Sequence, residues 1–140
     1  MRALVLAFVL AACAQTPAPS PPQPDYLSGT AWQRVDDLDA MPHPARMQFE
    51  HGRASGYTGC NRWSSDAVRS GGDGLRFENI TVTERACNGA GVQMATEHNF
   101  LNVIRNARRA HYDQAALVLF DSRDQQIARF ETDAPIDSDE

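Results

Sequence analysis

The chain has 140 residues and a formal net charge of −5, a length that accommodates one domain of ordinary size but not two. Acidic and basic residues nearly balance between residues 25 and 130, and much of the negative surplus lies in the last ten residues. Every basic residue is Arg, and the arginines are spread along the chain. This excludes the one-sided basic surface that nucleic-acid binding requires.

Residues 1–12 have the pattern of a lipoprotein signal peptide, with a short positive start and a continuous apolar run over residues 3–10. That run is shorter than the roughly 20 residues that a membrane-spanning helix needs. The letters LAAC ending at Cys13 resemble a bacterial lipobox, which implies that Cys13 is acylated and anchors the chain in a membrane. Ala14 takes the place of the aspartate that retains many lipoproteins at the inner membrane. We therefore expect a location in the bacterial cell envelope, at the outer membrane facing the periplasm.

Residues 13–25 form a Pro-rich tether after the lipidated cysteine. Proline fixes φ and removes a backbone donor, so this stretch is predicted to be extended and semi-rigid, holding a domain over residues 26–131 away from the lipid. A Pro-rich recognition segment for a partner is the alternative. Residues 132–140 are predicted to be an acidic, disordered tail.

Short strands dominate the predicted domain. Met47 and Phe49 alternate with polar residues, as in a half-buried strand, and a Gly-rich turn follows at residues 71–74. Residues 26–35 are expected to be the first structured segment, with a bend at Gly29 and Trp32 as an apolar anchor. Strands are expected over residues 45–50, 53–60, 75–79, 110–113, 115–121 and 126–131, with 80–87 as a short strand or an irregular crossover. The last two strands form a hairpin around the turn 121–125.

Residues 92–107 are the one predicted helix, because apolar residues recur at helical spacing. The apolar face consists of Met94, Phe100, Leu101 and Ile104. The predicted fold class is mainly β with one helix, at the α+β border: a small, strongly curved antiparallel sheet or barrel covered by that helix.

Cys60 and Cys87 are the two cysteines that remain once Cys13 carries lipid. In an oxidising compartment such a pair predicts a disulfide, which would stabilise the fold by about 3 to 4 kcal/mol. The rival interpretation is a thiol-dependent enzyme with Cys60 as nucleophile and His98 or His111 as base.

No pattern in the chain indicates a cofactor or a metal. The histidines lack metal-ligand spacing, and the acidic run at residues 36–39 lacks the glycine and glutamate of a calcium loop. Nucleotide-binding and hydrolase motifs are absent from the sequence. The four histidines are interpreted as surface and turn residues: His43, His51, His98 and His111. We therefore expect no catalytic activity.

Several motifs in one order resemble the META domain (HslJ-like) family. They are Gly29-Thr30-Ala31-Trp32, Met47-Gln48-Phe49, the run Gly56 to Trp63 (GYTGCNRW), Thr83-Glu84-Arg85-Ala86-Cys87, the helix with Glu97 and Phe100, and the final hairpin. Ala86 departs from the Met common in the family. The resemblance implies a small β-rich fold with one helix, often secreted or lipid-anchored, in which Cys60 and Cys87 can pair. The family is linked to envelope stress and antibiotic tolerance and has no known shared catalytic residues.

Two interpretations of the GYTGCNRW run remain open. In the structural one, Gly56 and Gly59 allow a bend, Asn61 caps a turn and Trp63 packs over the disulfide. In the functional one, an exposed recognition patch is formed by Tyr57, Asn61, Arg62 and Trp63.

The function expected from these features is that of a non-enzymatic envelope lipoprotein, bound to the membrane through Cys13. It would bind or support other envelope components, such as a protein partner, with a role in stress response or antibiotic tolerance. The alternative is a carrier that holds a small apolar ligand in a curved sheet or barrel. The sequence indicates neither the ligand nor the oligomeric state.

Overall fold

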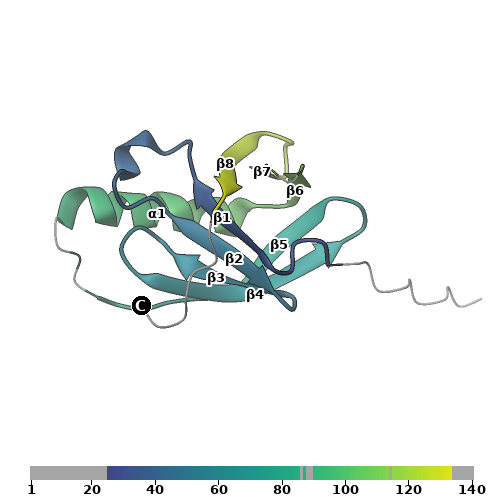
Figure 1. Cartoon of the computed structure of the whole chain (residues 1–140), viewed down its shortest axis with the longest axis horizontal. Helices are drawn as coiled ribbons and strands as arrows, with labels where there is room; N and C mark the ends of the chain where they lie inside the picture. Colours follow the sequence, from purple (N-terminus) through teal and green to yellow (C-terminus); the bar gives the residue numbers. More distant parts are fainter. Residues whose placement is uncertain (1–24, 86, 88–89, 114, 134–140) are drawn as a thin grey trace, which may run out of the picture.

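The structure is a computed structural model that describes residues 25–85, 87, 90–113 and 115–133 (Figure 1). The predicted signal peptide, Cys13 and nearly all of the tether therefore lie outside the described residues, as does the tail from residue 134 onward.

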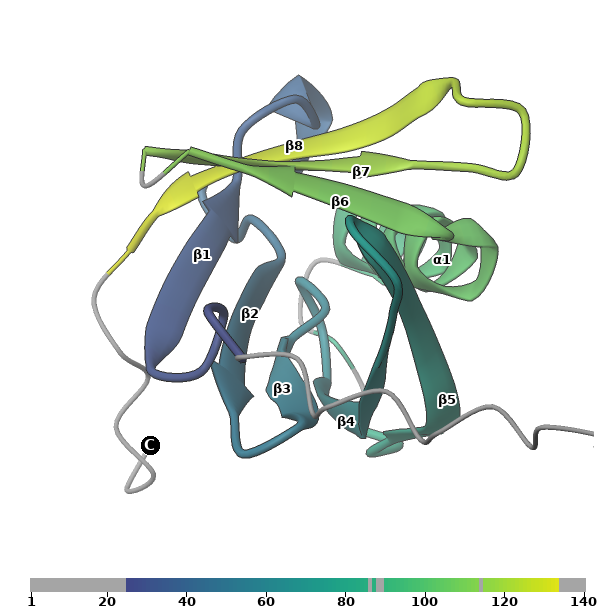
Figure 2. The ribbon, with the colours of Figure 1, turned by 90° about the vertical axis from the view of Figure 1, so that its right-hand side faces the viewer.

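Eight antiparallel strands form a closed ring in which each strand pairs with the next along the chain, and the last pairs with the first (Figure 2). The strands are β1 (Thr30–Arg34), β2 (Arg46–Glu50), β3 (Arg53–Tyr57), β4 (Arg62–Ser70), β5 (Gly74–Val82), β6 (Arg109–Tyr112), β7 (Ala116–Phe120) and β8 (Gln126–Thr132). A short 3₁₀ helix, η1 (Leu38–Ala40), interrupts the connection from β1 to β2. The predicted fold class, mainly β with a single covering α-helix, is confirmed.

The ring is weakest between β5 and β6, which share only the pair Gly74 and Arg109. Between these strands the chain forms the helix α1 (Ala90–Asn106), which packs against β5 (Figure 2). Phe100 and Ile104 of α1 are fully buried. The helix thus supplies the apolar cover that the poorly paired seam would otherwise lack.

Aromatic side chains fill the inside of the ring. Trp63 contacts Phe77 and Phe100 edge to face, with ring centroids 6.0 and 5.1 Å apart, and Phe100 contacts Phe130 in the same way at 6.5 Å. Edge-to-face pairs at such distances are favourable beyond the burial of their area. The other large, fully buried side chains are Trp32, Leu27, Met47, Leu75, Ile104, Leu117 and Leu119.

Three predicted details of the elements were wrong. Met94 belongs to α1 but is 62% exposed, because this end of the helix extends past the packed core. The strand expected over 53–60 ends at Tyr57, where a turn begins. Residues 75–82 continue as one strand, although Asn79 has a φ of +52° and marks a register shift.

The tail begins later than predicted. Thr132 is the last residue of β8, and the backbone N–H of Asp133 donates to the carbonyl of Ala31 at 2.8 Å. Asp133 also forms an ion pair with Arg46 of β2. Thr132 and Asp133 are therefore part of the domain. No helix within the described ranges is long and apolar enough to cross a membrane.

Candidate functional site: a groove on the outer face of β2 to β4

A tight turn of residues 58–61 joins β3 to β4 and is organised by the buried hydroxyl of Thr58. That oxygen accepts the backbone N–H groups of Cys60 and Asn61 at 3.2 and 2.9 Å. Gly59 has a φ of +103°, and a Cβ there would lie 2.5 Å from Cγ2 of Thr96 in α1. Glycine is needed at this position both for the backbone conformation and for the close approach of the helix.

Asn61 connects this turn to two other parts of the molecule. Its side-chain oxygen accepts the backbone N–H of Arg85 at 2.7 Å, and its amide nitrogen donates to Oε2 of Glu97 at 2.9 Å. The hydroxyl of Thr58 donates to the same Glu97 oxygen at 2.6 Å. Asn61 is only 5% exposed, so these hydrogen bonds satisfy polar groups that would be costly to bury alone.

Cys60 and Cys87 form a disulfide in the structure, with their Cα atoms 5.6 Å apart. The bond attaches the segment that follows β5 to the turn between β3 and β4. Arg85 lies within this segment, two residues before Cys87. The disulfide and Asn61 together fix the backbone that carries the Arg85 side chain.

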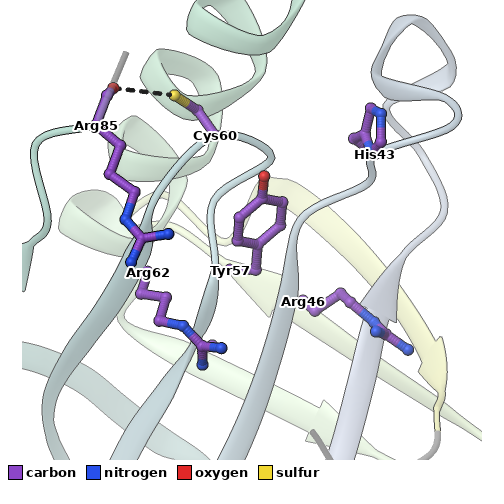
Figure 3. Close-up of a pocket in the computed structure, with 7 residues that line it drawn as sticks. His43, Arg46, Tyr57, Cys60, Arg62 and Arg85 are labelled. Carbon is purple, nitrogen blue, oxygen red and sulfur yellow. Dashed lines mark hydrogen bonds between the residues drawn. The ribbon is translucent and has the colours of Figure 1, made fainter. Parts of the chain in front are cut away.

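Beside this turn the outer surface is hollowed into a pocket of about 360 Å³ (Figure 3). The register of the sheet places Arg46, Tyr57 and Arg62 side by side on neighbouring strands. The pocket is lined by His43, Arg46, Gly56, Tyr57, Cys60, Arg62 and Arg85. A Cβ at Gly56 would lie 2.1 Å from the carbonyl oxygen of Arg46, so β2 and β3 leave no room for a side chain there.

Two further hollows continue the pocket across the sheet, and we call the three together the Tyr57 groove. One, of about 340 Å³, shares Gly56 and Arg62 with the pocket and is also lined by Ser55, Trp63, Ser64, Thr81, Val82 and Thr83. The other, of about 300 Å³, shares His43, Arg46 and Tyr57 and adds Gln33, Pro42 and Pro44. None of the lining residues is acidic.

The arginines of the groove differ in their partners. Arg46 is paired with Asp133. No ion pair joins Arg62 or Arg85 to another residue in the described part of the chain. Other arginines of the same sheet are paired: Arg53 with Asp66 at 2.7 Å, and Arg76 with Glu78 at 3.2 Å. The groove therefore presents two guanidinium groups that no carboxylate of the described chain neutralises.

The structure separates the four residues of the predicted recognition patch. Tyr57 and Arg62 line the groove. Asn61 is 5% exposed and lines none of the three hollows. Trp63 borders the second hollow but is only 3% exposed and packs its rings in the aromatic core, so neither side chain forms an exposed patch. Arg46 and Arg85 line the groove as well. The sequence alone did not indicate them, because it is the pairing of β2 with β3 and the disulfide that bring these two residues close to Tyr57.

The histidines singled out in the sequence lie at the surface of the molecule. All four histidines are exposed, and His43 alone among them lines the groove. Within the residues that the structure describes, no group of three or more His, Cys, Asp or Glu side chains could hold a metal ion.

The eight consecutive antiparallel strands form a closed ring that is covered by one helix, and a disulfide lies beside the groove on its outer face. The molecule is therefore a small disulfide-containing β-ring domain. The META domain profile matches residues 25–134, and the chain belongs to the META domain family. This confirms the resemblance seen in the sequence motifs.

Solved structures share the fold at low sequence identity. A protein from Burkholderia xenovorans, solved by NMR, is 19% identical with a TM-score of 0.59, and the match covers 91% of this chain and all of that one. The crystal structure of a DUF4847 family protein from Bacteroides vulgatus is 14% identical with a TM-score of 0.61, covering 80% of this chain and 98% of that one. No curated protein matches the chain.

Proposed function

We propose that the chain is a non-enzymatic lipoprotein of the cell envelope, whose META domain binds an envelope component in the Tyr57 groove. In this proposal Cys13 carries the lipid anchor, residues 14–25 hold the domain off the outer membrane on its periplasmic side, and binding supports the envelope under stress or antibiotic exposure. The observation that carries the proposal is the groove itself, three adjoining hollows across β1 to β5 lined by arginine, tyrosine, serine and threonine side chains together with apolar residues.

Binding is favoured over catalysis by the state of the cysteines. The sulfur of Cys60, the nucleophile of a thiol enzyme, is bonded to that of Cys87. A disulfide sulfur is not the thiolate that such chemistry requires. The packed aromatic core inside the ring gives the apolar-carrier alternative no supporting observation, since Trp32, Phe100 and Phe130 occupy that space.

Photo-crosslinking in living cells tests the proposal. Thr81 is exposed and lines the groove, whereas Ser122 is exposed in the turn between β7 and β8. A photoreactive amino acid at residue 81 should capture an envelope component that the same probe at residue 122 does not. Equal capture from both positions, or none from residue 81, would contradict a binding role for the groove.

A further inference from the structure

The ligand class that the groove fits can be inferred from its side chains, and this inference rests on the proposed function. We propose that the Tyr57 groove binds an acidic saccharide, with carboxylate or phosphate oxygens held by Arg62 and Arg85 and sugar hydroxyls by the serines and threonines beside them.

Charge gives the first argument. Acidic and basic residues nearly balance between residues 25 and 130, yet the lining of the groove contains three arginines and no Asp or Glu. Two other hollows on the molecule, at η1 with α1 and at the β7–β8 turn, each include aspartate. Arg62 and Arg85 have no carboxylate partner in the described residues, so an anionic ligand would gain charge-assisted hydrogen bonds without displacing an existing ion pair.

Placement gives the second argument. Arg62 and Arg85 lie on one side of the Tyr57 ring, and Arg46 and His43 lie on the other (Figure 3). The backbone of Arg85 is fixed by Asn61 and by the nearby disulfide, and that of Arg62 is fixed in β4. Because these backbones are fixed, only the side chains need to be ordered when a ligand binds, which costs less conformational entropy than ordering a whole segment.

The strands beneath the groove and the hydroxyls that line it favour a saccharide over a peptide as the ligand. A peptide in an extended conformation commonly binds by adding a strand to a free sheet edge. Beneath the groove β2, β3 and β4 are paired on both sides, so their backbones offer no free edge. The groove instead offers side-chain hydroxyls, which both donate and accept hydrogen bonds, as sugar hydroxyls do. These belong to Ser55, Ser64, Thr81 and Thr83. Ser64 and Thr81 share one hydrogen bond at 2.8 Å, and Thr83 accepts the backbone N–H of Arg62 at 3.1 Å, which leaves further acceptor capacity on these oxygens.

Binding of defined oligosaccharides to the purified full-length chain in detergent tests the inference by titration calorimetry. The probes are an oligogalacturonate, a phosphorylated malto-oligosaccharide, a neutral malto-oligosaccharide of equal length and a pentaglutamate peptide. The variants are Arg62→Gln and Arg85→Gln, with Arg76→Gln as a matched control, because Arg76 lies on β5 outside the groove and pairs with Glu78.

We expect at least one acidic saccharide to bind, and the neutral one to bind about tenfold more weakly or not at all. Each groove variant should weaken acidic binding by about tenfold, the effect of losing a charge-assisted hydrogen bond, while the control variant binds like the wild type. Which acidic probe binds distinguishes a carboxylate from a phosphate as the recognised group.

Three results would overturn the inference. Equal binding of the neutral saccharide would remove the anionic requirement, tighter binding of pentaglutamate would indicate an acidic polypeptide, and no binding of any probe would exclude the class. The crosslinking from residue 81 is independent of these titrations, so the proposed function could stand where this inference fails.

Discussion

The side chains that shape the groove are positioned by residues that do not touch it. Asn61 is buried, yet it holds the backbone of Arg85 and joins the β3–β4 turn to Glu97 of α1. Gly59 allows that turn to approach the helix closely. At the scale of single residues, the GCN sequence at residues 59–61 therefore has a structural role: it fixes the turn and the backbone beside the groove.

Gly59 gives a prediction with an internal control. Gly59→Ala should lower the free energy of unfolding by about 2 kcal/mol or more, because alanine is strained at a φ of +103° and its Cβ would collide with Thr96. Gly91→Ala, in α1 with open space around it, should instead raise stability by about 0.5 kcal/mol. Urea unfolding measures both, and a Gly59 variant as stable as the wild type would contradict the role assigned to this turn.

Among the elements, the β7–β8 hairpin is closed by the carboxylate of Asp121. It accepts the backbone N–H groups of Gln125 at 3.0 Å and Arg123 at 2.8 Å. These hydrogen bonds, that to Gln125 first, hold the pKa of Asp121 below its ordinary value. The pKa of Asp113, in the connection from β6 to β7, is lowered in the same way, because its carboxylate accepts the backbone N–H groups of Ala116 and Ala115.

The lowered pKa of Asp121 predicts a pH dependence of stability. Because the folded-state pKa lies below the unfolded value of about 3.9, the stabilisation is present above that value and is lost as pH falls through the folded pKa. Asp121→Asn should therefore be less stable than the wild type at pH 7, and the difference should shrink on acidification below pH 4. Urea unfolding at several pH values measures it, and a difference that is constant with pH would argue against the carboxylate's role.

The elements also show what the sequence could and could not predict. The β7–β8 hairpin was predicted because apolar strands flank a turn of polar residues. β4 was not predicted, since its polar run Ser64-Ser65-Asp66 hides the alternation of a strand. Helical spacing placed Met94 with Phe100 on one apolar face, but spacing alone cannot tell where a helix extends beyond its core.

The candidate site was predicted only in part, for a similar reason. Tyr57 and Arg62 were singled out because they lie in a distinctive motif. Arg46 and Arg85 come from distant segments that sheet pairing and the disulfide bring together. For Trp63 the sequence left a core role and a recognition role open because an aromatic side chain suits both, and the packing of Trp63 inside the closed ring favours the core role.

At the scale of the whole molecule, the structure shows a disulfide-linked domain with an outward-facing groove, and we propose that a lipid anchor and tether precede it. The proposed anchor and the disulfide both depend on export of the chain. An exported chain would use Cys13 for lipid and leave Cys60 and Cys87 to pair in an oxidising compartment. If the chain were not exported, both the location and the binding role would lose their basis.

The most direct test is the intact mass of the chain extracted from membranes and alkylated with and without prior reduction. We expect a mature chain that begins at Cys13, carries the added mass of acyl chains and gains two alkyl groups only after reduction. A chain that retains residues 1–12, lacks the acyl mass or labels at Cys60 or Cys87 without reduction would contradict it.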